Sequence, residues 1–133
     1  MTARRSEIRV DDLSEPFSHY TDAVRYGDLL FISGCAPLDR DGNLVGTDAA
    51  SQARQVLQNM SSVLQAAGAG FKDVLKVTVY LTDINDRERI NEVRAQFFGD
   101  TRPASTLVQV SRLVVPGMSV EIEAVAAVPQ LFA

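Results

Sequence analysis

The sequence predicts an α+β fold in which two helices pack on one face of a single mixed β-sheet. The first observation is size: 133 residues suit one domain, 1–133, and a hydrophobic content of 46% beside 23% charged residues suffices for a buried core. The second is periodicity, since two segments carry apolar residues at helical spacing and five carry strand patterns. Their order is β-β-α-β-α-β-β, with room for one more strand at the start.

The amino-terminal third predicts a hairpin over residues 23–34. Gly27 supplies the backbone freedom that its turn needs, and the apolar run LLFIS after it suits a strand buried on both faces. The segment EIRV, residues 7–10, is the candidate for the additional strand. Residues 37–46 are rich in turn formers, and we expect their tight turn at Gly42.

The first helix is predicted between Asp48 and Gly68. Asp48 is a typical N-cap residue, and Gly68 is a typical stop just beyond the last turn. Between them, apolar residues recur at helical spacing and form one stripe, which should be buried against the sheet. That stripe consists of Ala49, Ala53, Val56, Leu57, Met60, Leu64 and Ala67.

A half-buried strand is predicted over residues 74–81, because its side chains alternate. Leu75, Val77, Val79 and Leu81 should face one way, and Lys76, Thr78 and Tyr80 the other. The second helix follows, since Asn85 and Glu88 have the spacing of a capping box and Gly99 is a typical helix end. Its apolar stripe consists of Ile90, Val93 and Phe97.

Two further strands are predicted over residues 105–110 and 119–128, and Pro116-Gly117 marks the turn between them. Two amphipathic helices with one apolar face each should pack on the same side of the sheet. The other face of the sheet then remains open in a single chain, although its strands carry apolar residues there. We therefore expect self-association to cover that face.

Composition narrows the classes of function. The net charge is −4 and the sequence pI is about 4.9, which disfavours a surface that neutralises nucleic-acid phosphates. The single cysteine cannot form an internal disulfide. No apolar run is long enough to span a bilayer and no secretory signal is apparent, so we expect a cytoplasmic protein with no membrane or nucleic-acid partner. Motifs for nucleotide cofactors, catalytic zinc and serine hydrolysis are missing, so no cofactor is expected.

Two glutamates stand out because they interrupt an otherwise apolar strand. Glu121 and Glu123 are two residues apart and therefore point to the same face. A solvated strand face is the more common explanation for such a pair. The alternative is that one carboxylate lies in a partly dry cleft, where its pKa rises and it acts as an acid or base near neutral pH. Spacing alone leaves both interpretations open.

The other chemically distinctive residues have plain structural explanations. His19 has no partner at metal-ligand spacing and fits a surface position, and Cys35 fits a small buried thiol better than a nucleophile. Arg87 and Arg94 share one face of the second helix. They form either a solvated stripe, which is the favoured interpretation, or a pair of guanidinium groups that reach a cleft and bind a carboxylate.

Taken together, these segments resemble the YjgF/RidA family over nearly the whole chain. The resemblance is carried by YTDAV (20–24), FISGCAPLDRDGNLVG (31–46), the segment 52–86 that begins QARQVLQNM, INEVRAQFF (90–98), RPASTLVQVSRL (102–113) and VEIEAVA (120–126). It implies the chorismate-mutase-like fold, an α+β sandwich, and a homotrimer. Such an assembly would cover the open sheet face and place the ligand pockets in the clefts between subunits.

The resemblance also implies an enzyme that works without a cofactor on a small-molecule metabolite. The best-known members hydrolyse reactive enamines and imines, releasing ammonia and a 2-keto acid. In those members a glutamate of the VEIEA motif positions the water, which makes Glu121 the implied catalytic residue. The residues implied to line the substrate pocket are Tyr20, Ser33, Gly34, Asn91, Ser105 and Leu107.

One position departs from the deaminase pattern. The arginine that grips the substrate carboxylate in those members corresponds to Ser105 here. A hydroxyl cannot replace a bidentate guanidinium, and losing such a charge-assisted pair costs about 1.5–3 kcal/mol. Arg87, Arg94 and Arg102 are the candidates for a displaced cation at the substrate site.

Three functions remain open from the sequence. The first is a deaminase-type hydrolase of an enamine, imine or related reactive metabolite, with a substrate preference altered by Ser105. The second is a trimeric small-molecule-binding or sensor protein without catalysis, which fits the missing anchor equally well. The third is the endoribonuclease or translation-inhibitor role sometimes attached to the family. The acidic pI, the single histidine and the lack of a basic, aromatic stripe weigh against this third function.

Overall fold

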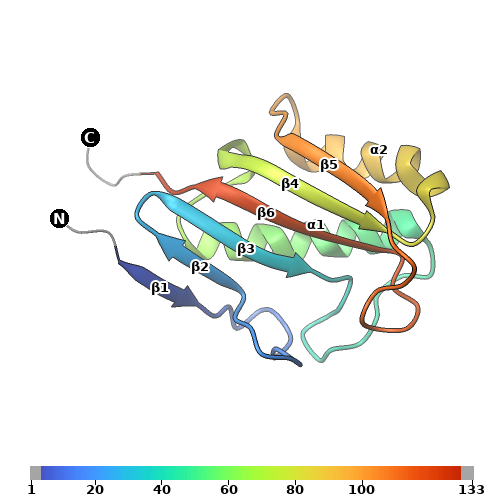
Figure 1. The fold of residues 1–133 in the computed structure, drawn as a ribbon, viewed down its shortest axis with the longest axis horizontal. Coiled ribbons are helices and arrows are strands. Elements are labelled where there is room, and N and C mark those ends of the chain that lie inside the picture. Colours follow the sequence, from blue (N-terminus) through green and yellow to red (C-terminus); the bar gives the residue numbers. More distant parts are fainter. Residues whose placement is uncertain (1–3, 130–133) are drawn as a thin grey trace.

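The centre of the protein is one six-stranded mixed sheet in the order β1-β2-β3-β6-β4-β5 (Figure 1). The structure is a computed structural model that describes residues 4–129. The strands are β1 (Arg5–Ile8), β2 (Ala23–Tyr26), β3 (Leu29–Cys35), β4 (Val74–Leu81), β5 (Ala104–Gln109) and β6 (Val120–Ala127). Neighbours are antiparallel except β4 and β5, which are parallel. The predicted class and element order are confirmed. An additional first strand is present, but it spans Arg5–Ile8 instead of the expected residues 7–10, because its pairing with β2 ends at Ile8 opposite Ala23.

Both helices lie on the same face of this sheet, as predicted (Figure 1). Helix α1 (Ala49–Ala66) packs on β3 and β6, and helix α2 (Arg87–Phe98) packs beside α1. The side chain of Asp48 accepts a hydrogen bond from the N–H of Ser51 at 2.8 Å, which confirms the predicted N-cap. Gly68 follows α1 with a φ of +76°, a left-handed conformation that ends the helix.

The core lies between the helices and the sheet. The predicted stripe on α1 is buried except for Ala67, which is partly buried beyond the last turn. Along β6, buried residues alternate with more exposed ones, so one face of this central strand packs on the helices and the other does not. Among the largest fully buried side chains are Leu30, Leu57, Met60, Leu64, Leu81, Ile90 and Ile122.

The structure corrects the prediction for the start of β4. Val77, Val79 and Leu81 are buried as expected, but the side chain of Leu75 is 50% exposed. The reason is an irregularity in the pairing of β4 with β6 between Val74 and Lys76. Such a bulge inserts one residue and reverses the face to which its side chain points.

The start and the stripe of α2 also differ from the prediction. Asn85 forms no capping box; instead, the side chain of Asp83 accepts a hydrogen bond from the N–H of Asn85 in a short 3-10 turn, Ile84–Asp86. Helix α2 begins only after that turn. Phe98 is buried in the apolar stripe, whereas the predicted Phe97 is only partly buried.

The face of the sheet away from the helices is open in the chain. The run after Gly27 is therefore not buried on both faces as predicted, because Leu29 and Phe31 point to the open face and are 39% and 47% exposed. Tyr26 and Val108 are also exposed. The apolar residues expected on this face are present, and their coverage by another copy of the chain stays a prediction.

The long connection between β5 and β6 is anchored by a buried side chain of α1. Nε2 of Gln52 donates hydrogen bonds to the carbonyl oxygens of Gly117, at 2.9 Å, and Gly46, at 3.3 Å. Its Oε1 accepts from the N–H of Ser119 at 2.6 Å. Because every polar atom of this buried amide has a partner, the connection that carries Val114 is held against the helix.

Candidate functional site

Glu121 lies on the central strand β6 and points to the open face of the sheet. Its cross-strand neighbour is Tyr80 on β4. Glu121 is partly buried, whereas Glu123, which faces the same way, is exposed. Burial raises the pKa of Glu121, and the negative charge of Glu123 raises it further. The structure therefore supports the partly dry cleft for Glu121 and the solvated face for Glu123.

The carboxylate of Glu121 rests against the backbone of Gly34. Strand β3 departs from regular pairing with β6 between Ile32 and Cys35, and Gly34 lies within that irregular stretch. A Cβ atom at Gly34 would lie 2.6 Å from Oε2 of Glu121 and 2.7 Å from its Cδ. Only a residue without a side chain leaves the carboxylate in this position.

Glu121 and Gly34 line a cleft of about 370 Å³. This volume lies within the range of roughly 300–1,000 Å³ that is typical of small-molecule sites. The other residues that line the cleft are Phe17, Ser18, Tyr20, Ser33, Ala36 and Val114. The structure therefore brings together four of the predicted site residues, Tyr20, Ser33, Gly34 and Glu121. We refer to this as the Glu121 cleft.

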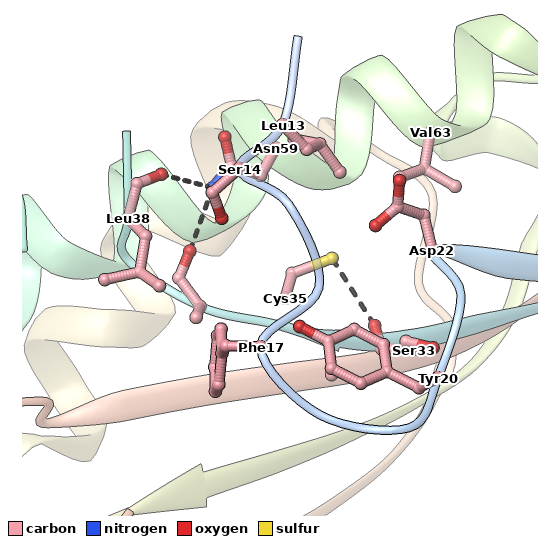
Figure 2. Close-up of a pocket in the computed structure, with 12 residues that line it drawn as sticks. Leu13, Ser14, Phe17, Tyr20, Asp22, Ser33, Cys35, Leu38, Asn59 and Val63 are labelled. Carbon is pink, nitrogen blue, oxygen red and sulfur yellow. Dashed lines mark hydrogen bonds between the residues drawn. The ribbon is translucent and has the colours of Figure 1, made fainter. Parts of the chain in front are cut away.

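A smaller cavity of about 40 Å³ shares Phe17, Tyr20, Ser33 and Gly34 with the Glu121 cleft. Figure 2 shows the rings of Phe17 and Tyr20 beside each other, and Cys35 also lines this cavity. The two rings meet edge to face with centroids 6.0 Å apart. Burial raises the pKa of Tyr20, so its hydroxyl remains a protonated donor at neutral pH.

Ser33 is fixed by the segment that precedes β2. Its Oγ donates a hydrogen bond to the carbonyl oxygen of Thr21 at 2.6 Å, and its N–H donates to the carbonyl oxygen of Asp22 at 3.0 Å. Because the hydroxyl proton is used in this way, the oxygen presents its lone pairs to the cleft. Ser33 is therefore oriented as an acceptor for a donor on a bound molecule.

Two residues that the sequence analysis missed hold the loop 11–20 in place. Nη1 of Arg9 donates to the carboxylate of Asp22 at 2.5 Å, and Nη2 donates to the carbonyl oxygen of Ser14 at 3.1 Å. Asp22 is buried and also accepts from the N–H of Val10 at 2.8 Å. The available signal was an acidic residue directly before an apolar strand, which requires a partner when it is buried.

Cys35 and His19 occupy the positions predicted for them. Cys35 is buried, and burial raises its pKa to about 12, so the thiol is protonated at neutral pH. Its Sγ donates to the carbonyl oxygen of Ser33 at 3.6 Å (Figure 2). His19 is exposed. Within residues 4–129, no group of three or more His, Cys, Asp or Glu side chains is arranged to hold a metal ion.

A second group of predicted residues meets where α2 passes the start of β5. Nη2 of Arg94 donates to Oγ of Ser105 at 3.0 Å, and Nη1 donates to Oδ1 of Asn91 at 3.3 Å. Burial lowers the pKa of Arg94. Asn91, Arg94 and Arg102 line a cleft of about 560 Å³, which we call the Arg94 cleft. Arg87 is exposed at the first position of α2 and is not among its lining residues.

The two clefts lie on opposite faces of the sheet within one chain. Ser105 on β5 lies beside Val77, which faces the helices, whereas Glu121 lies beside Tyr80 on the open face. The residues that line the two clefts do not overlap. A single chain therefore does not bring the predicted catalytic carboxylate and the predicted anion-binding residues together.

Comparison with known proteins identifies the group to which this fold belongs. The family model described as "Endoribonuclease L-PSP" matches residues 12–128. A RutC family protein of Pyrococcus horikoshii is 44% identical over 120 residues, which cover 90% of this chain and 94% of that relative. The chain belongs to the YjgF/RidA family.

Two further proteins are similar to this YjgF/RidA chain, one by its sequence and one by its solved structure. The human 2-iminobutanoate/2-iminopropanoate deaminase is 43% identical over 108 residues, which cover 80% of this chain and 78% of that enzyme. The crystal structure of the Rid family protein YyfA of Yersinia pestis has a TM-score of 0.89 at 35% identity, covering 94% of this chain and 100% of that one. The predicted chorismate-mutase-like fold is confirmed.

The predicted pocket residues of this YjgF/RidA chain thus divide into two sets. Tyr20, Ser33, Gly34 and Glu121 line the Glu121 cleft, and Asn91 and Ser105 meet Arg94 beside α2. Leu107 belongs to neither set, since it is partly buried and packs against the core. In the part of the chain that the structure describes, no helix is both long and apolar enough to cross a membrane.

Proposed function

We propose that this protein is a cofactor-independent hydrolase of the imine-deaminase type, acting on a small reactive imine or enamine. The observation that supports this most is the carboxylate of Glu121, held against Gly34 in a cleft that raises its pKa. A carboxylate with a raised pKa is a stronger base than an ordinary one and accepts a proton more readily from a bound water. The name of the human relative, 2-iminobutanoate/2-iminopropanoate deaminase, supports the same reaction class.

Hydrolysis of an imine requires a water molecule that is held next to the C=N carbon and a group that accepts its proton. Glu121 accepts a hydrogen bond from a water molecule and orients its oxygen toward the electrophilic carbon of the C=N bond. As the C–O bond forms, the carboxylate takes the proton of the water and returns it to the nitrogen. The same carboxylate then takes the proton of the new hydroxyl group and passes it to the amino nitrogen, and as the C–N bond breaks, ammonia is released and a C=O group is left. No electrons are gained or lost overall.

The division of the pocket residues supports a site that is completed between subunits. Glu121 and Arg94 face different clefts in one chain, and the open sheet face carries exposed apolar side chains such as Phe31. In a closed ring of three copies, the Glu121 cleft of one subunit meets the Arg94 cleft of the next, and the open faces cover one another. The proposed assembly is a homotrimer with three shared pockets, as the resemblance to the family implies, and its proposed location is the cytoplasm.

The test is acceleration of imine hydrolysis. Imines would be generated in place by an amino-acid oxidase from several parent amino acids, and their decay and the release of ammonia would be followed. The wild type should accelerate decay, and Glu121→Gln should lower that acceleration at least about 100-fold, because it removes the acid–base group. Glu123→Gln is the matched control, since Glu123 lies on the same strand face but is exposed.

Each outcome of this experiment either supports or rejects the proposed hydrolase. Acceleration that survives in Glu121→Gln would remove Glu121 from the mechanism. No acceleration by the wild type on any imine would reject the hydrolase and favour the non-catalytic small-molecule-binding protein. Analytical ultracentrifugation gives the assembly independently, because a trimer has a mass three times that of the 14.5 kDa chain.

A further inference from the structure

Arg94 is a half-buried cation with only neutral partners. Its guanidinium donates to the hydroxyl of Ser105 at 3.0 Å and to the side-chain oxygen of Asn91 at 3.3 Å. Within the described part of the chain, Arg94 forms no ion pair. Withdrawing a guanidinium from water without a countercharge is unfavourable, and burial lowers its pKa accordingly. A group held in this way is ready to receive an anion.

The surroundings of Arg94 fit an anion. The Arg94 cleft, of about 560 Å³, is lined by two guanidinium groups, Arg94 and Arg102, and by no Asp or Glu. A guanidinium has five N–H donors, and the two bonds to Ser105 and Asn91 leave the others available. Two parallel N–H groups are the arrangement that binds a carboxylate in a bidentate manner.

The short side chain of Ser105 leaves room for the guanidinium of Arg94, which reaches this position from helix α2. Its side chain lies on the helix side of β5, where it meets the guanidinium from α2. A long side chain at position 105 would occupy the space into which Arg94 now reaches. Ser105 is short enough to admit that guanidinium and polar enough to orient it. The hydroxyl thus positions the cation instead of replacing it.

We propose that Arg94, oriented by Ser105 and Asn91, binds the carboxylate of the substrate in the Arg94 cleft. Of the three candidates for a displaced cation, Arg94 is the one whose guanidinium is both partly buried and fixed by side-chain hydrogen bonds. Arg102 is exposed at the rim of the same cleft, and Arg87 is exposed on the first turn of α2. The identity of the anion as a 2-imino or 2-oxo acid rests on the proposed function.

The test measures binding separately from turnover. The probe is 2-oxobutanoate, a stable 2-oxo acid, titrated by calorimetry into the intact protein, with 2-oxobutanamide as its uncharged counterpart. Arg94→Gln should weaken binding of the acid about tenfold to hundredfold, which corresponds to one charge-assisted hydrogen-bonded pair, and leave the amide unaffected. Arg89→Gln is the control, because Arg89 is an exposed arginine on the same helix. A loss of 2-oxobutanoate binding in Arg102→Gln but not in Arg94→Gln would overturn the assignment.

A double substitution separates binding from a purely structural role. Arg94→Gln combined with Ser105→Arg returns a guanidinium to the same place from β5 and should restore binding of 2-oxobutanoate. If Arg94 only supported the fold, the second substitution would not restore binding. Failure of the wild type to bind 2-oxobutanoate would overturn this inference even if imines are hydrolysed. Conversely, carboxylate binding that depends on Arg94 would stand even if no imine is hydrolysed.

The kinetic form of the test applies if imines are turned over. Arg94→Gln should raise KM for imines that carry a carboxylate and change kcat much less, because the carboxylate keeps its charge while the neighbouring carbon reacts, so its contact with Arg94 serves the ground state and the transition state alike. For neutral imines made from simple amines, KM should not change. An equal effect on charged and neutral imines would overturn the assignment.

Discussion

The carboxylate of Glu121 packs closely against the backbone of Gly34. A Cβ atom added at Gly34 would lie only 2.6 Å from Oε2 of Glu121. The contact joins the irregular end of β3 to the middle of β6. It makes the position of the carboxylate depend on the absence of a side chain at one backbone position. A glycine that is required for this reason differs from one required for a turn, since Gly34 has no positive φ.

Gly34→Ala should therefore impair function much more than stability. The backbone at Gly34 accepts alanine, but the new methyl group must displace the Glu121 carboxylate. A displacement of about 1 Å lowers the rate of imine hydrolysis on the order of 100-fold. The control is Gly70→Ala, because a Cβ at Gly70 has nothing within 4 Å and φ there is −145°. Steady-state rates and thermal unfolding check this, and full activity in Gly34→Ala would contradict it.

Glu121 should make the protein less stable as the pH rises. Folding raises the pKa of this carboxyl group by burial and by the charge of Glu123. Its contribution is therefore fully present below the unfolded-state value of about 4.3 and is lost as the pH rises through the folded-state value. Glu121→Gln removes this dependence. The Tm of Glu121→Gln minus the Tm of the wild type should increase between pH 4 and pH 8. A difference that stays constant over this range would argue against a desolvated carboxyl group.

Two impaired variants should complement each other when they share a trimer, provided that the substrate is a carboxylate-bearing imine at a concentration well below its KM. If each pocket takes Glu121 from one subunit and Arg94 from the next, a trimer that mixes Glu121→Gln and Arg94→Gln chains contains one intact pocket. Random mixing of equal amounts makes about three quarters of the trimers mixed, so about a quarter of the wild-type activity should return. The measurement is imine hydrolysis after co-refolding. Activity no greater than the mean of the two variants would place both groups in the same subunit's pocket.

Gln52→Leu should destabilise the fold through the β5–β6 connection. The buried amide makes three hydrogen bonds, to Gly46, Gly117 and Ser119. Leucine leaves these backbone groups without partners, and each unsatisfied buried group costs about 1–3 kcal/mol. Gln58→Leu, at an exposed position of the same helix, should change the unfolding free energy by less than about 0.5 kcal/mol. Urea titrations of both variants measure the difference, and equal midpoints would be the contrary result.

Cys35 should be unreactive in the folded protein. Burial raises its pKa to about 12, so at pH 8 almost no thiolate is present and reagents have no access. A chromogenic disulfide reagent should label the protein only after unfolding, and then with one equivalent, because the chain has one cysteine. Cys35→Ala should retain activity. Rapid labelling of the native protein would show that the smaller cavity opens.

Local patterns predicted most of the fold because they depend on near neighbours in the sequence. The stripe of α1, its cap at Asp48 and the order of the strands follow from periodicity and turn residues. Two of the failures arose where pairing between strands overrides the pattern. The bulge at Leu75 depends on the register against β6, and the exposure of Phe31 depends on which sheet face the helices leave open.

The sequence predicted several residues of the candidate site, but it did not predict which of their side chains are in contact. Resemblance to a family selected Tyr20, Ser33 and Glu121, and the structure places all three in one cleft. The contact between Arg94 and Ser105 joins a helix to a strand, so no spacing rule indicates it. The same holds for the hydrogen bonds of Arg9 across the loop 11–20, because a buried ion pair depends on which distant segments meet.

The place of β6 in the sheet bears on how the chain is made. Among the described residues 4–129 this strand comes after all the others in the sequence, yet it lies between β3 and β4 and carries Glu121. During synthesis, every earlier strand is complete while the two edges that flank β6 remain unpaired and exposed to other chains. Pairing of β3 with β6 also requires closing a long loop, which slows folding. The strand that carries Glu121 is therefore also the one whose pairing ends the exposure of two sheet edges to other chains.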